Sequence, residues 1–377
     1  MSQNKIILIR NAAKADFGGA ERMPVFISRE LKRYGFETII LSGSKKLLHF
    51  AKQQNVSYIK SWWWPQQNWS GWRAALVPIY ILWQVVLFFY YMRLFISLRP
   101  SVVSLQSKDD FIAGTFAARV LNIKVFWIDH GDLKAIWMNH NLWYKNPVGK
   151  LVYLASHIVS YIVVASKSEV RLISSEVPGS LVIKKLKLIH NGMFDTYNTS
   201  KKTIDFISTA RLVTDKGVGE LIEAFSRVVK KHPSATLAIV GDGPEREKFK
   251  QQARGIPGIT FYGHQSNPLK FLEKSRIFIL PTHHEAFGVA VVEACMEGLA
   301  IIATDVGGIP EIISDSKSGI LVPVKDIDSL YKAMDRLYKD VRLQQSLGKA
   351  ARQRFLDKFN FSEIIKRDYL PLIQNSL

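Results

Sequence analysis

A chain of 377 residues is longer than one ordinary hydrophobic core requires, and it predicts two domains of roughly 150–200 residues each. Its composition, 47% apolar and 22% charged, excludes a largely disordered protein. The lone cysteine, Cys295, excludes an internal disulfide framework and suits a reducing cytoplasm.

The net charge of +19 is distributed unevenly along the chain. Residues 1–195 hold 25 Lys and Arg against 11 Asp and Glu, whereas residues 196–377 hold 26 against 21. A basic first half attracts nucleic acid, anionic lipid headgroups or phosphorylated substrates. No zinc-finger spacing or ribonucleoprotein signature accompanies the charge, so no nucleic-acid partner is expected. A lipid surface or an anionic acceptor is favoured, and charge that only aids solubility is the plain alternative.

The N-terminus is expected to form the first buried strand of the fold. The apolar run at residues 6–9 is too short for a secretory signal, and Arg10 follows it at once. Similar short β-branched runs alternate with helix-length segments along the whole chain. The expected strands are residues 5–9, 37–41, 102–105, 124–128 and 161–165 in the first half, and 205–210, 236–240, 259–262, 277–280 and 300–304 in the second.

This rhythm predicts the fold class. Unbroken apolar strands separated by helices form parallel sheets covered on both faces. We therefore expect an α/β protein with two doubly wound, Rossmann-like domains, in which ligands bind outside the carboxyl ends of the strands. Residues 195–202 are polar and lack periodicity, so the break between the domains is expected near residues 193–204.

Residues 77–92 form an unusually apolar stretch, followed by Arg93 and Arg99. Five tryptophans precede it: Trp62, Trp63, Trp64, Trp69 and Trp72. The stretch is interrupted by Gln84 and falls short of the roughly 20 residues that span a bilayer, so a membrane span is disfavoured. A buried core helix explains its apolarity, and a helix at a membrane interface explains the tryptophans and the cations. The sequence leaves both interpretations open.

Gly18 and Gly19 follow the first strand and precede a helix expected over residues 22–34. Paired glycines at such a turn let the backbone approach a ligand, and the helix N-terminus can present its amides to a phosphate. A tight turn without a ligand is the plain alternative.

In the second half, Arg211 and Lys216 share the loop before a helix expected over residues 218–229. Arg binds phosphate oxygens with a planar fork and Lys acts as a point charge, so the pair can neutralise a diphosphate without a metal. Two solvated surface cations are the alternative. The glycine-rich loop at residues 241–244 either borders a base or only turns the chain.

Residues 280–298 carry the most chemical information. A strand is expected to end at Leu280, a loop carries Glu285, and a helix is expected to begin near Gly288. Glu293 then lies about one to two turns inside that helix, so two carboxylates can flank its N-terminus. Carboxylates suit sugar and ribose hydroxyls, whereas the free amides suit phosphate. The alternative is one Glu that complements the helix dipole and another on the helix surface.

These motifs, taken in order, resemble those of the GT4 family of retaining glycosyltransferases. The likeness is close over residues 205–323 and looser elsewhere. The motifs that carry it are Gly18-Gly19-Ala20-Glu21, His130-Gly131, Asn191-Gly192, Arg211 with Lys216, Glu285 with Glu293, and residues 304–311.

The resemblance implies the GT-B fold, with two Rossmann-like domains, a cleft between them and a C-terminal helix that crosses back to the first domain. It implies an acceptor-binding domain at residues 1–195, on which residues 360–377 pack. It also implies a nucleotide-sugar-binding domain at residues 203–359. A hinge between the domains would allow closure over the donor.

For the second domain, the resemblance implies that Glu285 binds hydroxyls of the donor sugar and Glu293 binds the ribose. The backbone of Phe287, Gly288 and Val289 would hold sugar and phosphate. Arg211 and Lys216 would stabilise the charge that develops on the departing diphosphate.

For the first domain, the resemblance implies that Gly18 and Gly19 approach the diphosphate and that His130 lies near the reacting sugar. A structural histidine at the edge of the core is the alternative for His130. Catalytic roles are thus expected for His130, Arg211, Lys216 and Glu285.

The resemblance implies a same-face displacement in which the departing phosphate helps to deprotonate the acceptor, with Glu285 as a covalent nucleophile as the competing mechanism. Asp109-Asp110 is not the Asp-x-Asp metal motif of the other major glycosyltransferase fold, so no metal and no further cofactor are expected. The chain departs from the family at Ala300, where proline is frequent, and in the double histidine 283–284. These departures leave the donor sugar open.

The expected function is transfer of a sugar from a UDP- or GDP-linked donor to a polysaccharide or lipid-linked saccharide, as in lipopolysaccharide assembly. A cytoplasmic location, with peripheral contact to an anionic inner membrane, is part of this expectation. Two alternatives stay open: a soluble glycosyltransferase for a small metabolite, and a non-catalytic protein that binds nucleotide sugars.

Overall fold

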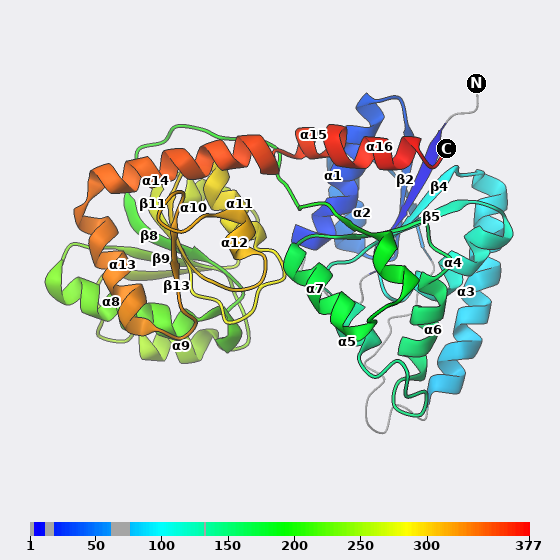
Figure 1. Ribbon diagram of the computed structural model, residues 1–377. Helices are drawn as coiled ribbons and strands as arrows, with labels where there is room; N and C mark the ends of the chain where they lie inside the picture. The colour runs from blue at the N-terminus through cyan, green and yellow to red at the C-terminus, as the bar shows by residue number, and fades with distance from the viewer. Residues whose placement is uncertain (1–3, 12–18, 62–75, 132) are drawn as a thin grey trace. The chain divides into compact units, whose positions relative to one another are not determined.

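The computed structural model describes residues 4–11, 19–61, 76–131 and 133–377. The chain divides into two compact units (Figure 1). Unit 1 comprises Met1–Ile189 together with Ile365–Leu377, and unit 2 comprises His190–Ile364. Gly18 and the five tryptophans that precede residue 77 lie outside the described residues.

Unit 1 is built on a parallel sheet of seven strands in the order β3-β2-β1-β4-β5-β6-β7. Its strands are β1 (Lys5–Ile9), β2 (Glu37–Ser42), β3 (Ser57–Lys60), β4 (Val102–Leu105), β5 (Lys124–Ile128), β6 (Tyr161–Val164) and β7 (Leu186–Leu188). Its helices are α1 (Gly19–Arg33), α2 (Lys45–Gln53), α3 (Val77–Leu98), α4 (Phe111–Val120), α5 (Leu133–Trp137), α6 (Pro147–Ser156), α7 (Lys167–Glu176), the 3-10 turn η2 (Leu181–Lys185), the π-helical turn η5 (Ile365–Tyr369) and α16 (Leu370–Gln374).

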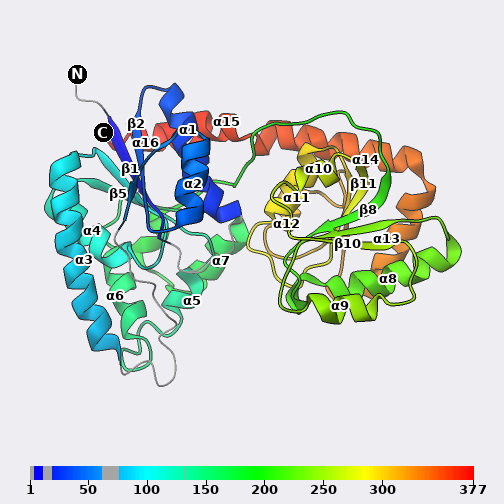
Figure 2. The ribbon, with the colours of Figure 1, turned by 180° about the vertical axis from the view of Figure 1, so that it is seen from behind.

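The two faces of this sheet carry different helices (Figures 1 and 2). Successive side chains of a strand point to opposite faces, so Ile6 and Leu8 face α1 and the C-terminal segment, whereas Ile7 and Ile9 face the layer of α3, α4 and α6. Both faces are covered, which explains why these strands are apolar throughout.

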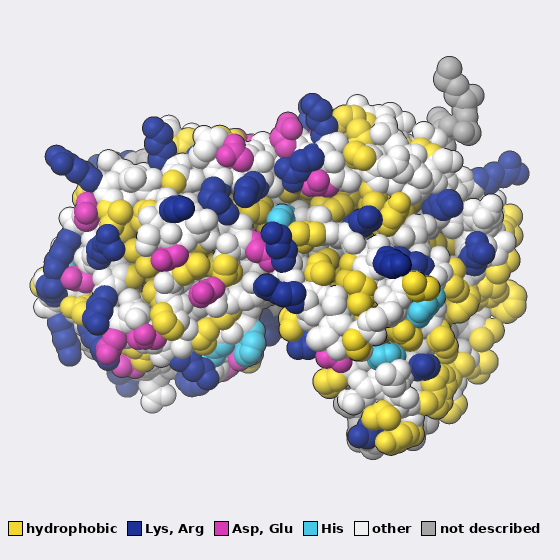
Figure 3. Space-filling view, viewed as in Figure 1, with side chains coloured by type: hydrophobic (Ala, Val, Ile, Leu, Met, Phe, Trp, Pro, Cys, Tyr) yellow, Lys and Arg dark blue, Asp and Glu magenta, His cyan; other side chains and the backbone are white. Residues whose placement is uncertain are grey.

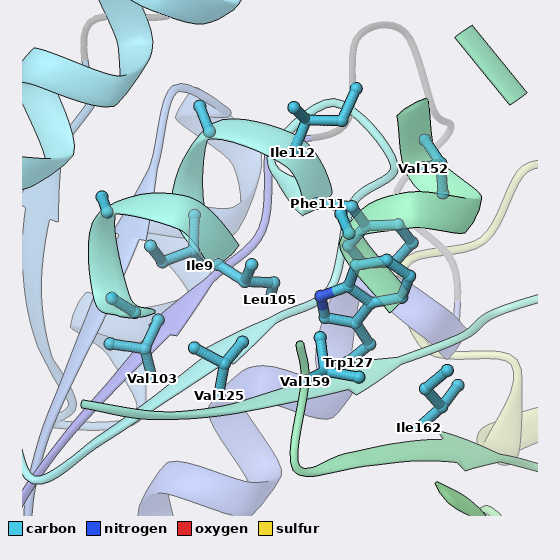
Figure 4. Packing of buried hydrophobic residues seen from close by; sticks show 14 of the residues in the cluster. Ile9, Val103, Leu105, Phe111, Ile112, Val125, Trp127, Val152, Val159 and Ile162 are labelled. Carbon is cyan, nitrogen blue, oxygen red and sulfur yellow. The ribbon is translucent and has the colours of Figure 1, made fainter. Parts of the chain in front are cut away.

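The larger core of unit 1 lies under that second layer. The Trp127 and Phe111 rings stack with centroids 4.2 Å apart, and aliphatic side chains of β1, β4, β5 and β6 surround them (Figure 4). The Trp127 indole donates a hydrogen bond to Thr115 Oγ1 at 2.9 Å, so its one polar group is satisfied within α4.

Unit 2 repeats the plan with six parallel strands in the order β10-β9-β8-β11-β12-β13. Its strands are β8 (Ile204–Thr209), β9 (Leu237–Val240), β10 (Ile259–Gly263), β11 (Ser275–Leu280), β12 (Ala300–Thr304) and β13 (Ile320–Val322). Its helices are the 3-10 turn η3 (Thr214–Lys216), α8 (Val218–Lys231), α9 (Arg246–Gln252), α10 (Leu269–Leu272), α11 (Val289–Met296), α12 (Ile309–Ile312), α13 (Ile327–Lys339), α14 (Val341–Arg354), the π-helical turn η4 (Phe355–Phe359) and α15 (Phe361–Ile364).

The expected α/β class with two doubly wound, Rossmann-like sheets is confirmed. Three strands escaped the sequence prediction: β3, β7 and β13. Each lies at the edge of its sheet, and edge strands are short and partly polar because one side is not paired. β3 and β7 are partly polar, and β13 is apolar but only three residues long, so none of them shows an apolar run of the length that marks the central strands.

The division between the units falls after Ile189, just before the polar stretch where the sequence suggested the break. His190 belongs to unit 2 because its ring packs on Phe287 and Phe359 and its Nε2 lies 3.1 Å from Glu311 Oε2. At the other end, the chain returns to unit 1 after Ile364 through η5, which contacts α1.

Candidate active site

In both sheets the strand order reverses once, and in unit 2 this happens between β8 and β11. Open parallel sheets bind ligands at such a switch point, outside the carboxyl ends of the strands. The loop after β8 carries Arg211 and Lys216, and the loop after β11 carries Glu285. The sequence-predicted residues therefore meet at one edge of one sheet.

The loop after β8 is shaped by a close approach of two backbones. Gly217 adopts φ +68°, and a methyl group added to it would lie 1.9 Å from the carbonyl oxygen of Pro281. Only glycine fits there. Lys216, the preceding residue, ends the turn η3 and is thereby held against the loop that follows β11.

Hydrogen bonds join the two loops across the switch point. The Asp215 carbonyl accepts from the His283 amide at 2.7 Å and from Thr282 Oγ1 at 3.0 Å. The His283 ring contacts Glu220 on α8, with Nε2 2.8 Å from Oε1. Three polar contacts thus link the Lys216 segment to the Glu285 loop. Thr304 Oγ1 donates to the Thr282 carbonyl at 2.6 Å and ties the same loop to the end of β12.

The result is an ion pair at the switch point. Lys216 Nζ lies 2.7 Å from Glu285 Oε2, and both side chains are half-buried. Arg211 is exposed, and its side chain makes no hydrogen bond or ion pair within the described residues. A carboxylate and a cation in contact, with a second cation on the same loop, can bind a ligand that has both hydroxyls and phosphates.

The Glu285 loop is backed by residues 305–308. Gly307 adopts φ +55°, and a methyl group there would lie 1.5 Å from the Glu285 carbonyl oxygen. One added to Gly308 would lie 2.8 Å from Phe287 Cα. The sequence grouped the glycines with Glu285 only through the resemblance, and this packing is the physical reason for their presence.

Phe287 is buried, while Gly288 is the residue before α11 and Val289 is the first residue of the helix. The free amides of this first turn lie next to the Glu285 loop and can bind an anion. Glu293 lies within α11 and is buried, so it is no surface residue of the helix.

One acidic residue of this unit was missed by the sequence reading. Glu297 follows α11, is buried, and its Oε2 has no hydrogen-bond partner among the residues described. Burial raises the pKa of its carboxyl to about 7, against the opposing effect of Lys202. No sequence signal separates this glutamate from Glu293, because burial is decided by the packing of the whole unit.

In unit 1 the switch point lies between β1 and β4, and its polar groups were not predicted. Arg10 contacts Glu21 Oε1 at 2.8 Å and donates to the Gln106 carbonyl. Asn11 donates to both oxygens of Asp110, at 3.1 and 3.3 Å. The Tyr91 hydroxyl donates to Asp110 Oδ1 at 2.5 Å, and burial raises the pKa of that carboxyl to about 6.

Of the three site residues that the sequence predicted in unit 1, the structure describes two. Gly18 lies outside the described residues, and Gly19 is the first residue of α1. His130 follows β5, and its Nε2 is buried without a hydrogen-bond partner in the described part of the chain. Burial and the nearby Arg10 hold the pKa of His130 well below its usual value, so the ring is neutral near pH 7.

No group of three or more His, Cys, Asp and Glu side chains suited to a metal ion occurs in the parts of the chain described above.

The loop at residues 241–244 lies beside the Arg211 loop, since the Leu212 amide donates to the Asp242 carbonyl at 3.0 Å. Unit 2 thus brings Arg211, Lys216 and Glu285 to its switch point, beside the start of α11.

Comparison with known proteins agrees with this geometry. Residues 193–354 match the family Glycosyl transferases group 1. N-acetyl-alpha-D-glucosaminyl L-malate synthase of Bacillus anthracis is 32% identical over 171 residues, which cover 45% of this chain and 44% of that protein. The capsular polysaccharide biosynthesis glycosyltransferase CapM of Staphylococcus aureus is 25% identical over 209 residues, 53% of this chain and 54% of CapM.

The chain thus spans about half the length of these curated relatives. Across the whole chain, the crystal structure of Anabaena HepE in complex with UDP-glucose superposes with a TM-score of 0.76 at 16% identity, covering 99% of this chain and 100% of that one. This likeness shows the fold of both units. The chain therefore has the GT-B fold, and its match to the group 1 glycosyl transferases lies in residues 193–354.

Proposed function

We propose that the chain is a retaining glycosyltransferase that moves a sugar from a UDP- or GDP-linked donor to a polysaccharide or lipid-linked saccharide. The observation that carries the proposal is the contact of Lys216 Nζ with Glu285 Oε2 at 2.7 Å, at the switch point of unit 2. The pair offers a cation for a diphosphate and a carboxylate for sugar hydroxyls within one hydrogen-bond length.

On donor binding, Lys216 and Glu285 would exchange their contact with each other for contacts with the donor. Sugar hydroxyls would donate to Glu285, and Lys216 would turn to the diphosphate together with Arg211. The amides at the start of α11 would bind the same phosphates, with Phe287, Gly288 and Val289 as the backbone that holds them. Glu293 would bind the ribose. These roles follow the resemblance and agree with the chemistry of each group.

In the reaction, the bond between the sugar C1 and the diphosphate oxygen breaks, and the diphosphate leaves with the electron pair. The acceptor hydroxyl forms the new bond to C1 on the same face and passes its proton to the leaving phosphate oxygen. Arg211 and Lys216 stabilise the charge that develops there, which typically contributes about 3–4 kcal/mol per donor group. In the competing mechanism Glu285 attacks C1 as the diphosphate leaves with the electron pair, and the acceptor hydroxyl then displaces the Glu285 carboxylate from the covalent intermediate and passes its proton to the departed phosphate.

We assign acceptor binding to unit 1, at the cytoplasmic face of an inner membrane. His130, which follows β5 of this unit, would lie near the reacting sugar, and its neutral ring can hydrogen-bond a sugar hydroxyl there. CapM, named for capsular polysaccharide biosynthesis, supports a saccharide acceptor. HepE, solved with UDP-glucose, supports a nucleotide-sugar donor.

A second candidate is transfer to a small soluble acceptor. The Bacillus anthracis relative, whose name includes L-malate, favours it. The two candidates can be separated by measuring the rate of transfer to competing acceptors. Faster transfer to a water-soluble hydroxy acid than to any saccharide would favour the second candidate over the first.

The test is transfer or donor hydrolysis by the full chain, screened over UDP- and GDP-sugars by thermal shift and then by release of the nucleotide. We expect Glu285→Gln and Lys216→Ala each to lower the rate by about 10²–10³-fold. The matched control is the exposed pair Glu247 and Lys250 on α9, at 3.1 Å, whose variants Glu247→Gln and Lys250→Ala should keep the full rate.

Two results would count against the proposal. Donor binding without hydrolysis or transfer to any saccharide would make the chain a binding protein. The anomeric configuration of the product can be read from its anomeric proton by NMR at early times. A configuration opposite to that of the donor would disprove the retaining mechanism but not the transfer itself.

A further inference from the structure

The helix α3 (Val77–Leu98) has two apolar faces, and only one of them is covered. By length and composition α3 is long and apolar enough to cross a bilayer. Its inner face packs on the core of unit 1 through Tyr80, Leu87, Tyr91 and Phe95, all fully buried.

Polar contacts fix this inner face in place. Gln84 donates to the Asp109 carbonyl and accepts from the Ala113 amide, both at 3.1 Å, and so binds the start of α4. Tyr91 donates to the buried Asp110. A helix that carries these hydrogen bonds belongs to the folded unit, and a span surrounded by lipid would lose them.

The outer face consists of large apolar side chains that are open to solvent. Ile79 is 63% exposed, Leu82 65%, Phe89 65% and Ile96 57%. With Val86 and Arg93 they recur at alternating intervals of three and four residues, which places them on one stripe of the helix. We call this stripe the α3 face. Figure 3 shows hydrophobic side chains gathered along the margin of the molecule where α3 runs in Figure 1.

The adjacent helix extends the apolar surface. α4 packs along α3, and it exposes Phe116 and Val120. Contiguous apolar surface of this kind is unusual in a protein that meets only water, and it marks a site for a partner or a membrane.

The charges around the α3 face are of one sign. No Asp or Glu occurs between Glu37 and Asp109, and none occurs within α3, α4, α5 or α6. Arg93, Arg99, Arg119 and Lys124 are exposed on or next to these helices. An apolar stripe bordered by exposed cations is complementary to an anionic lipid surface, which attracts Lys and Arg side chains.

We propose that the α3 face lies in the interface of an anionic membrane, parallel to its plane, with unit 1 on the cytoplasmic side. The inner face of α3 stays in the protein core while Ile79, Leu82, Phe89 and Ile96 enter the boundary between headgroups and acyl chains. This inference concerns where the chain is held and does not require that it transfers sugars.

A second copy of the chain is the other occupant that such a stripe suits, because intervals of three and four residues also support helix pairing. Charge argues against it. Two copies would bring Arg93 and its neighbours together without any carboxylate on the helix to pair with them, whereas anionic lipid supplies the opposite charge.

The experiment is sedimentation of the full chain with phosphatidylcholine vesicles that contain either no phosphatidylglycerol or about 30% of it. We expect binding to the anionic vesicles, weakened by salt. Leu82→Glu combined with Phe89→Glu should lower the partition at least about tenfold, because two buried apolar side chains are lost. The matched control is Val341→Glu with Leu356→Glu, two exposed apolar residues of unit 2, which should bind as the native chain does.

A second measurement does not depend on the folding of those variants. Cys295, the only cysteine, is buried, so Leu82→Cys can be labelled selectively with an environment-sensitive dye. Anionic vesicles should shift its emission to the blue, and the same dye on Val341→Cys should not respond. An unshifted Leu82 label, or equal vesicle binding by the double variant, overturns the proposal. A dimer that forms without lipid and is lost in the double variant assigns the α3 face to a second copy instead.

Discussion

The two units share a strand order but use their switch points differently. In unit 1 the groups between β1 and β4 are buried and bind one another: Arg10 with Glu21, and Asn11 and Tyr91 with Asp110. In unit 2 the charged side chains Arg211, Lys216 and Glu285 are half-buried or exposed, and the contact among these three is the ion pair of Lys216 with Glu285.

The sheet topology thus places a switch point in each unit, and the side chains there determine whether it serves stability or ligand binding. In unit 1 the described groups close the switch point with their own hydrogen bonds, so they contribute to stability. In unit 2 backbone contacts at Gly217 and Gly307 hold the loops that carry these side chains, which stay partly accessible and can exchange their own ion pair for contacts with a ligand. Substitutions in unit 1 should therefore change stability, and those in unit 2 should change ligand binding.

The largest effect on stability is expected for Arg10→Ala. Its guanidinium is buried between Glu21 and the Gln106 carbonyl, and removal leaves both without this cation. Breaking a buried ion pair from one side costs about 3–5 kcal/mol. Urea unfolding followed by circular dichroism measures this cost. A change below about 1 kcal/mol would mean that the unit 1 switch point is no more structural than that of unit 2.

Gly307→Ala tests whether the backbone holds the unit 2 site. Its methyl group would collide with the Glu285 carbonyl oxygen, and φ +55° adds strain, so the Glu285 loop must move. We expect a loss of about 1–3 kcal/mol of stability together with weaker binding of nucleotide sugars, measured by calorimetry. The control is Gly35→Ala, which also has positive φ but open space around it, and which should lose stability without losing donor affinity.

Tyr91→Phe removes one hydrogen bond from the closed switch point of unit 1. The bond stabilises the ionised Asp110, so its loss raises the pKa of that carboxyl above the present value of about 6. A raised pKa means that the stability from this group is complete in acid and is lost as the pH rises through 6. The variant should therefore lose about 1.5–3 kcal/mol at pH 8 and less at pH 5, as measured by urea unfolding at both values.

The sequence predicted the central strands, the two sheets and the segment from Arg211 to Glu285, because each is encoded by local pattern. Apolar runs of strand length mark β1, β4, β8 and β11, and loops that follow such strands meet at one edge whatever the rest of the chain does. This reasoning alone predicts that the loops of Lys216 and Glu285 lie close together.

The network of Arg10, Asn11, Tyr91 and Asp110 was missed because no local pattern encodes it. Tyr91 lies in a stretch that stands out in the sequence only for its apolarity, and Asp110 was considered only as half of an absent metal motif. Their contact joins residues that are 19 positions apart, and it depends on how α3 packs against α4. Gln84 likewise looked like an interruption of an apolar helix, whereas it binds the start of α4.

Glu297 provides the smallest and most specific test, because it is a buried carboxyl of unit 2 that lies outside the switch point. Burial raises its pKa to about 7, so its contribution to stability is complete in acid and is lost as the pH rises through 7. Glu297→Gln removes the charge but keeps the shape. The variant should therefore be more stable than the native chain by about 1–2 kcal/mol at pH 8.5 and equal to it near pH 5, as judged by thermal unfolding across that range. Donor affinity should not change, since Glu297 follows the far end of α11 from Glu285. A variant that is destabilised at pH 8.5, or that loses donor binding, would show that the ionised Glu297 has a role in the site.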